Sequence, residues 1–289
     1  TKIAIGYPPA NFTLPAMVAK EQGFFEKRGL DVTLTIIPII ANVPAAIVSG
    51  SVQAGVLVPS TLLAAAEGGL DLQAVVGGAT QTKQVPVGGV AVRPDAPINA
   101  PADFAGKRIA VPGLNALAHI TFMKWLKAAG VDPKQPRYVE AAFPQMGDML
   151  KGGTVDAVLA VEPFLSRLVE AKSGRLLANF QAEIMGGRIE TFYAMSKAFI
   201  DKNPTAVAAF RDAVREGVEW IAKNEAAARR YQVTYLKLPE PVAMSVKLPV
   251  YQTDVPTDDM RFWIELCKEF DVIKGTVTPA QVVWSAAAR

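Results

Sequence analysis

Two stretches of the chain are similar: SGSVQAGVLVP at residues 49–59 and GGTVDAVLAVEP at residues 152–163. When Gly50 is set on Gly153, three further pairs coincide: Val52 with Val155, Ala54 with Ala157, and Val58 with Val161. Each copy predicts a helix end, a glycine stop, a buried strand, and a proline before the next helix. Chance similarity between two ordinary strand–helix units would also explain the match. Because both copies lie in similar strand–helix surroundings, we favour two similar lobes.

Strand and helix patterns alternate around these stretches. We expect strands at residues 2–7, 31–37, 53–58, 72–76, 89–92, 108–111, 137–141, 156–161, 176–180 and 192–196. We expect helices at residues 14–28, 43–48, 60–67, 116–129, 145–150 and 164–171. Such alternation predicts an α/β protein with parallel sheets and helices on both faces.

The last third of the chain has a different pattern. Helical periodicity dominates it, and we expect helices at residues 204–223, 226–236, 242–248 and 258–270. Asn203-Pro204 is typical of a helix start, because proline has no N–H to leave unpaired at the first helical position. A mostly helical tail must pack on something, and the first lobe is its natural partner.

The composition excludes several classes of protein. The chain has 289 residues, 51% of them hydrophobic and 20% charged, with a formal net charge of +3. This is enough apolar content for one or two real cores, and the charge is too small and too dispersed to indicate nucleic-acid binding. The single cysteine, Cys267, and the single histidine, His119, exclude an internal disulfide and metal sites built on several cysteines or histidines.

The N-terminus and one uncharged stretch bear on location. The chain begins with Thr1 and runs directly into a strand pattern, so we expect a mature form whose signal peptide has been removed. Residues 32–66 carry no charged side chain, but Pro38, Pro44 and Pro59 interrupt them. A membrane-spanning helix needs about twenty mostly apolar residues without such breaks, so this stretch predicts buried strands and short helices.

The chain lacks the common catalytic and nucleotide-binding motifs. It contains no G-x-x-x-x-G-K-[ST] loop, no G-x-G-x-x-G helix opening and no G-x-S-x-G nucleophile elbow. A Ser-His-Asp triad would have to use His119 alone. These absences favour binding over catalysis.

Polar and aromatic side chains gather where predicted strands end. In open α/β sheets, ligands bind beyond the carboxyl ends of the strands, where helices begin. Those positions hold Tyr7, Asn11, Phe12, Ser60, Thr61, Thr80, Gln81, Thr82, Asn115, His119 and Glu162. The backbone N–H groups at the helix starts near Ser60 and Asn115 are suited to an anion.

Each candidate also has a structural explanation. Helix N-capping accounts for Ser60 and Asn115 as well as ligand binding does. His119, with Phe122 and Met123 nearby, fits a buried imidazole with an internal partner. Glu162 is either solvated at a cleft mouth or paired. Cys267 falls on an apolar helix face and is expected in the core.

Several segments together carry a family resemblance. They are IGY at residues 5–7, GFFEKRGL at 23–30, GKRIAV at 106–111, AH at 118–119, VDA at 155–157, EP at 162–163 and NP at 203–204. In this order and spacing, the chain resembles type II periplasmic solute-binding proteins of ABC importers. The similar branch is that for aliphatic sulfonates, taurine, nitrate and thiamine pyrimidines.

The resemblance implies a fold and a division of the chain. Two α/β lobes are joined by a two-stranded hinge, with a helical C-terminal extension and the ligand in the cleft. Lobe one comprises residues 1–86 and 191–289, and lobe two residues 87–190, with crossovers near 85–92 and 188–192. By position, the family's ligand contacts fall on Tyr7, Asn11, Phe12, Ser60, Thr61, Gln81, Thr82, Asn115, Leu117, His119, Glu162 and Arg188.

The resemblance also implies a role. It predicts a monomeric, non-enzymatic protein without a cofactor or a metal, which closes on a small solute and delivers it to a membrane permease. The location is periplasmic or extracytoplasmic, with a lipid anchor as an alternative to a removed signal. A rival is an enzyme on the same fold, acting on a pyrimidine or menaquinone precursor. The pyrimidine type uses a cysteine-rich motif, which the single cysteine does not match.

The chain departs from sulfonate binders at one run. Where those proteins read Gly-Ser-Ser-Ala-His, residues 115–119 read Asn-Ala-Leu-Ala-His, so two hydroxyls are missing. We therefore expect a less purely ionic ligand than sulfonate or nitrate. A small organic acid, aromatic ones included, would place its carboxylate on Arg188 or on a helix start. A nitrogenous ring donating to Glu162 is equally consistent.

Overall fold

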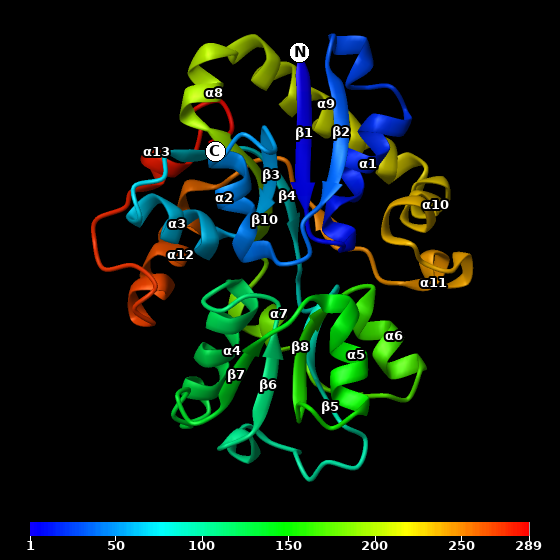
Figure 1. Ribbon diagram of the computed structural model, residues 1–289, viewed down its shortest axis with the longest axis vertical. Coiled ribbons are helices and arrows are strands. Elements are labelled where there is room, and N and C mark those ends of the chain that lie inside the picture. Colours follow the sequence, from blue (N-terminus) through cyan, green and yellow to red (C-terminus); the bar gives the residue numbers. More distant parts are fainter. Residues whose placement is uncertain (289) are drawn as a thin grey trace. The chain divides into compact units, whose positions relative to one another are not determined.

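The computed structural model describes residues 1–288, and they form two compact units (Figure 1). Within the described residues, the first comprises 1–80, 189–245 and 250–288, and the second 81–188 and 246–249. The chain therefore leaves the first unit after Thr80 and returns to it at Ile189.

The first unit is built on a six-stranded sheet with the order β11-β4-β10-β3-β1-β2. Its strands are β1 (Lys2–Tyr7), β2 (Asp31–Ile36), β3 (Ala54–Leu57), β4 (Leu72–Thr80), β10 (Ile189–Ser196) and β11 (Val250–Tyr251). β1 runs parallel to β2 and β3, whereas β10 is antiparallel to β3 and β4.

Helices cover both faces of this sheet (Figure 1). They are α1 (Leu14–Glu21), α2 (Val43–Val48), α3 (Pro59–Glu67), α8 (Lys197–Lys202), α9 (Pro204–Lys223), α10 (Glu225–Leu236), α11 (Glu240–Ser245), α12 (Thr257–Glu269) and α13 (Pro279–Val282). Short 3-10 turns add η1 (Asn11–Thr13), η2 (Glu26–Arg28) and η3 (Ile40–Asn42).

Strand alternation decides which helix meets which face. Gly55 of β3 faces α2 so closely that an added Cβ would lie 2.4 Å from Val43 Cγ1. On the neighbouring strand β10, the ring of Tyr193 points to the other face and contacts Phe210 of α9, with 5.8 Å between ring centroids. Successive side chains of a strand point to opposite faces, so this sheet is buried on both sides.

The second unit has a five-stranded sheet with the order β7-β6-β8-β5-β9. Its elements are β5 (Gly88–Val92), η4 (Pro101–Phe104), β6 (Arg108–Val111), α4 (Leu117–Ala128), β7 (Arg137–Glu140), α5 (Phe143–Lys151), β8 (Ala157–Val161), α6 (Phe164–Glu170), β9 (Arg175–Ala178) and α7 (Phe180–Met185). β6 is parallel to β7 and β8, and β5 is antiparallel to β8 and β9.

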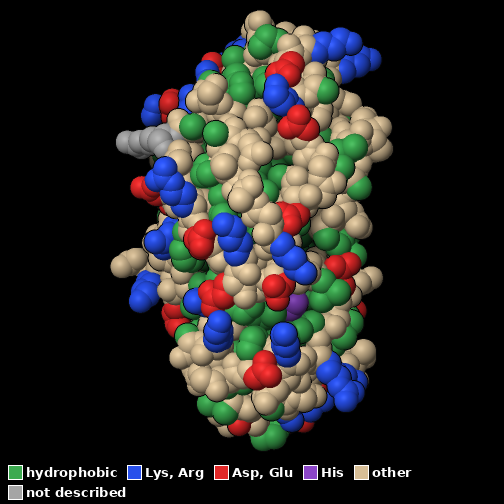
Figure 2. All heavy atoms as spheres, turned by 90° about the vertical axis from the view of Figure 1, so that its left-hand side faces the viewer, with side chains coloured by type: hydrophobic (Ala, Val, Ile, Leu, Met, Phe, Trp, Pro, Cys, Tyr) green, Lys and Arg blue, Asp and Glu red, His purple; other side chains and the backbone are tan. Residues whose placement is uncertain are grey.

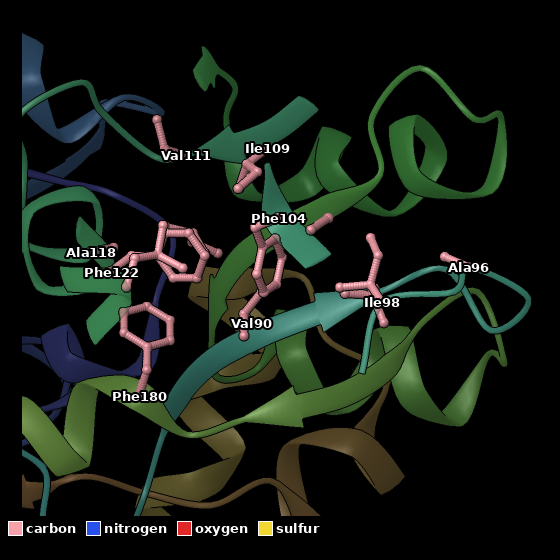
Figure 3. Close-up of a cluster of buried hydrophobic side chains, with 13 residues drawn as sticks. Val90, Ala96, Ile98, Phe104, Ile109, Val111, Ala118, Phe122 and Phe180 are labelled. Atoms are coloured by element: carbon pink, nitrogen blue, oxygen red, sulfur yellow. The ribbon is translucent and has the colours of Figure 1, made fainter. Parts of the chain in front are cut away.

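In the core of the second unit, Phe104, Phe122 and Phe180 pack among aliphatic side chains (Figure 3). Phe122 of α4 meets Phe104 edge to face at 5.1 Å between ring centroids, and it meets Phe180 of α7 in the same way at 5.2 Å. Edge-to-face pairs at such distances are favourable beyond the area that they bury. They fix α7 against α4.

The two sheets repeat one plan. From β4 to β2 the first sheet reads β4-β10-β3-β1-β2, and the second reads β9-β5-β8-β6-β7. In each, the second strand is antiparallel to both neighbours and the last three are mutually parallel. The repeated sequence stretches supply equivalent parts, since Gly50 and Gly153 both have left-handed φ angles, 76° and 71°, before β3 and β8.

The structure corrects two expectations about elements. Both sheets are mixed rather than parallel, because β10 and β5 run against their neighbours. The helix expected at residues 14–28 ends at Glu21, and a turn through Gly23 (φ 71°) separates it from η2. Phe24 and Phe25 keep the apolar spacing because both are buried, without being part of α1.

Candidate functional site

In the first unit, several candidate residues meet at one edge of the sheet. β1 and β3 are parallel and end at this edge, and the antiparallel β10 begins there. The edge therefore carries Tyr7, the loop to α1, the start of α3 and the first residues of β10. The predicted residues Tyr7, Asn11, Phe12, Ser60 and Thr61 are brought together here, and all are less than 9% exposed.

The Tyr7 hydroxyl forms a hydrogen bond within the first unit. Its hydroxyl donates to the Tyr235 carbonyl oxygen in α10 at 3.3 Å, and burial raises the Tyr7 pKa to about 12. The carbonyl of Asn11 accepts from the Tyr251 hydroxyl at 2.9 Å. The loop after β1 is thus held by two tyrosines from distant parts of the chain.

The start of α3 differs from the expectation that Ser60 is its N-cap. Val58, in extended conformation, holds the N-cap position, and Pro59 is the first helical residue. Proline suits that position because it has no N–H, so Ser60 falls inside the first turn. Its hydroxyl is buried and has no hydrogen-bond partner among the described residues. The Thr61 hydroxyl, in contrast, donates to the Val58 carbonyl at 2.9 Å.

Two further hydroxyls at this edge escaped the sequence prediction. Thr13 holds the N-cap position of α1, and Thr191 is the third residue of β10. Both are fully buried, and neither hydroxyl has a partner in the part of the chain that the structure describes. A Cβ on Gly78 would lie 2.8 Å from Thr191 Oγ1, so this hydroxyl lies over β4. Nothing in the local sequence pattern distinguishes either threonine.

In the second unit, candidate residues again meet at one sheet edge. β6 and β8 end there, and the antiparallel β5 begins there. The predicted Asn115, Leu117 and His119 follow β6, and Glu162 follows β8. The predicted Gln81 and Thr82 precede β5, and Arg188 follows α7.

The prediction that Asn115 is the N-cap of α4 is also wrong. Ala116 holds the N-cap position, and Asn115 has a left-handed φ of 59°. This conformation is one that asparagine tolerates. It directs the Asn115 backbone N–H to Nδ1 of His119, which accepts it at 2.9 Å.

That hydrogen bond fixes the state of the imidazole. Because Nδ1 is an acceptor, the neutral ring carries its proton on Nε2. Burial lowers the His119 pKa to about 4, which keeps the ring neutral near pH 7. Tyr138 of β7 packs edge to face against the ring at 4.1 Å between centroids. Nε2 has no partner among the described residues, so His119 presents a buried donor.

Glu162 is largely satisfied within its own unit. Its carboxylate accepts the Ser166 backbone N–H at 3.1 Å and the Ser166 hydroxyl at 2.7 Å, at the beginning of α6. Burial raises the Glu162 pKa, while the Ser166 bonds and the charge of Lys247 oppose the rise. The side chain is 3% exposed.

Gln81, Thr82 and Arg188 organise local backbone. Gln81 Oε1 accepts the N–H groups of Val87 and Gly88 at 3.2 and 3.1 Å. Thr82 Oγ1 accepts from the Val85 N–H at 3.1 Å. Arg188 donates to the Met185 carbonyl in the last turn of α7 at 2.9 Å. These contacts shape the segments that join the units.

One more buried donor at the second edge was not predicted. Gln181, in the first turn of α7, is 1% exposed, and its Nε2 has no partner among the described residues. The sequence predicted a strand at residues 176–180 and no helix after it, so it missed α7, the helix that carries Gln181.

Other kinds of site find no support in the described part of the chain. Residues 1–288 contain no cluster of three or more histidine, cysteine or acidic side chains suited to a metal ion. None of their helices is both long enough and apolar enough to cross a bilayer. Lysines, arginines and acidic side chains are interspersed on the face in Figure 2, in keeping with the small net charge.

Comparison with known proteins gives one family match and several relatives. Residues 11–228 match the family described as NMT1/THI5 like. The nitrate/nitrite binding protein NrtA of Nostoc sp. is 26% identical over 246 residues, which are 78% of this chain and 55% of that protein. The taurine-binding periplasmic protein of Escherichia coli is 28% identical, over 84% of this chain and 72% of its own. The chain thus spans about half the length of the cyanobacterial relative.

A solved structure shows the same fold. The alkanesulfonate-binding protein SsuA from Xanthomonas axonopodis pv. citri, bound to MOPS, matches with a TM-score of 0.84. The match covers 98% of both chains at 20% identity. The two-unit α/β architecture is therefore that of periplasmic binding proteins, as the sequence predicted.

Proposed function

Because the chain belongs to the NMT1/THI5-like family, we propose that it is the solute-binding protein of an ABC importer. It captures a small solute without changing it chemically and delivers it to a membrane permease. It works outside the cytoplasm, as a monomer. The names of its relatives, which include nitrate-, taurine- and alkanesulfonate-binding proteins, support this role.

One observation carries the proposal. The first turns of α1, α3 and α4 each hold a buried polar group without a partner among the described residues: Thr13 Oγ1, Ser60 Oγ and His119 Nε2. Helix starts also leave backbone N–H groups unpaired and carry positive partial charge. A buried polar group without a partner costs about 1–3 kcal/mol, so each of these groups is a candidate contact for a solute.

The chemistry of these groups indicates the solute class. The imidazole Nε2–H and the helix-start N–H groups donate, and hydroxyls donate readily, so the solute presents acceptors such as carboxylate, sulfonate or nitrate oxygens. Each unit also places a buried apolar side chain near its candidate polar groups, Phe12 in the first unit and Leu117 in the second, which suits a solute with a carbon skeleton. A small organic acid or sulfonate therefore fits better than a bare inorganic anion.

The available thiol does not favour covalent chemistry. Cys267 is buried in α12, and burial raises its pKa to about 12. A thiol with such a pKa supplies almost no thiolate near pH 7, so it is a poor nucleophile. This supports binding rather than catalysis.

A thermal-shift panel tests the proposal. The protein is unfolded and refolded to remove any retained solute, then melted with nitrate, taurine, methanesulfonate, benzoate, short carboxylates and amines. A solute at one hundred times its Kd should stabilise the fold by about 2.7 kcal/mol. We expect shifts from acids or sulfonates and none from simple amines. A flat panel, or a shift from amines alone, would contradict the proposal.

A further inference from the structure

Gln181 is held in place by the core of the second unit. Figure 3 shows the ring of its neighbour Phe180 beside that of Phe122 of α4. The two rings meet edge to face with 5.2 Å between their centroids. Phe180 is fully buried, and Gln181 is 1% exposed. The packing of Phe180 therefore anchors the first turn of α7, which carries Gln181.

Gly88 makes room for this carboxamide. A Cβ on Gly88 would lie 1.8 Å from Gln181 Oε1 and 3.2 Å from Val161 Cγ1. Gly88 pairs with Val161, the last residue of β8, and Glu162 follows directly. The Gln181 carboxamide thus lies at the same sheet edge as Glu162 and the start of α4.

The amide nitrogen at this edge lacks a partner. Gln181 Nε2 carries two N–H groups, is buried, and finds no acceptor among the described residues. His119 Nε2 is a second buried donor in the same situation. Two such donors at one sheet edge would each weaken the fold unless an acceptor reaches them.

We propose that Gln181 is a specificity-determining residue, which donates its carboxamide N–H to an oxygen acceptor on the solute. With the His119 Nε2–H, it makes the second unit select carboxylate, sulfonate or nitrate oxygens over ammonium groups. This inference rests on the proposed function and names a contact and a selectivity within it.

Another buried glutamine provides a matched control. Gln232 of α10 is fully buried, but its Nε2 donates to the Arg229 and Ala243 carbonyls at 3.3 and 3.2 Å. This amide ties α10 to α11 and has no predicted part in binding. Gln232 Oε1 has no partner among the described residues, so the two glutamines differ at their amide nitrogens: the fold uses that of Gln232 and does not use that of Gln181.

The test compares Gln181→Met with Gln232→Met in two measurements. Methionine has nearly the same volume without hydrogen-bond donors. First, refolded solute-free proteins are melted: Gln181→Met should melt at or above the wild-type temperature, and Gln232→Met below it. Second, taurine and nitrate are titrated: Gln181→Met should raise Kd about tenfold or more, and Gln232→Met should leave it unchanged.

The outcomes distinguish failure of the proposed function from failure of the inference about Gln181. If neither taurine nor nitrate binds the wild type, the titration moves to the best acid in the panel, and the proposed function is contradicted by a flat panel or by a shift from amines alone. If Gln181→Met melts clearly below wild type, or binds the probe with wild-type Kd, the inference about Gln181 is overturned while solute binding stands. Gly88→Ala displaces the carboxamide without removing it, so this substitution should also raise the Kd for the same probe.

Discussion

Ser60 and Thr61 are neighbours in the first turn of α3, yet only one hydroxyl is used by the fold. Thr61 Oγ1 donates to Val58, whereas Ser60 Oγ is buried without a partner among the described residues. Removing the Ser60 hydroxyl and removing the Thr61 hydroxyl should therefore have different effects. Binding should depend on Ser60 and stability on Thr61.

We expect Ser60→Ala to weaken binding of the best panel solute about tenfold and to leave the melting temperature of the solute-free protein unchanged or higher. Thr61→Val removes an internal hydrogen bond and should cost about 1 kcal/mol of stability. Calorimetric titration and thermal melting of both variants measure the two effects. Equal losses of stability would show that Ser60 is only structural.

His119 should make stability depend on pH. Its pKa is about 4 in the folded protein and 6.5 as its reference value, so between these values the unfolded chain binds more protons. Stability should therefore fall as pH decreases from 6.5 towards 4, by at most about 1.4 kcal/mol per pH unit. Because the chain has one histidine, His119→Gln should remove the histidine's contribution to this slope and leave that of acidic groups such as Glu162. Identical slopes for both proteins in urea unfolding would contradict the burial argument.

The sequence predicted which polar residues follow strands, and it missed positions that depend on packing. It placed His119 and Ser60 among polar residues at strand ends, and the structure brings them to sheet edges in their units. The helix caps were wrong because Pro59 and Ala116 shift each helix start by a residue or more. Gln181 and Thr191 gave no local signal, because their burial comes from distant contacts.

Among elements, helix boundaries were predictable where local chemistry marks them. The helix from Pro204 to Lys223 has the expected bounds, since proline fits its first position and its apolar residues recur at helical spacing. The helix from Leu14 was extended too far because Phe24 and Phe25 are buried in a turn. Apolar spacing reports burial, and burial alone does not distinguish a helix from the turn that follows it.

The crossing of α1 and α9 depends on one glycine. A Cβ on Gly217 would lie 2.5 Å from the Pro15 carbonyl oxygen, a backbone atom that cannot rotate away. Gly217→Ala should therefore destabilise the fold by about 1–3 kcal/mol, although alanine favours helix by about 1 kcal/mol.

Gly147→Ala in α5 is the control for this substitution. The nearest atom to its added Cβ is the flexible Leu168 Cδ2, 3.3 Å away. This variant should be neutral or slightly more stable in urea unfolding. If both alanine variants were stabilised equally, the close contact between α1 and α9 would not determine the stability of Gly217→Ala.

At the scale of the whole molecule, the repeated stretches indicated two similar lobes, and the two sheets have the same strand order. The direction of β10 and β5 was not predictable. Each is the first strand after the chain passes from one unit to the other, so it enters its sheet at the edge where the parallel strands end. Hydrophobic patterns record which residues are buried, and they carry no information on strand direction.

Isothermal titration of the best panel solute into the refolded wild-type protein distinguishes capture of a solute from its chemical conversion. Solute capture without conversion predicts a saturable signal with one site per chain, followed by a return to the baseline heat of dilution. Steady heat that continues with each excess injection would show turnover and contradict a binding role. Absence of a binding signal for every acid in the panel would contradict the assignment of the unpartnered donors to a solute.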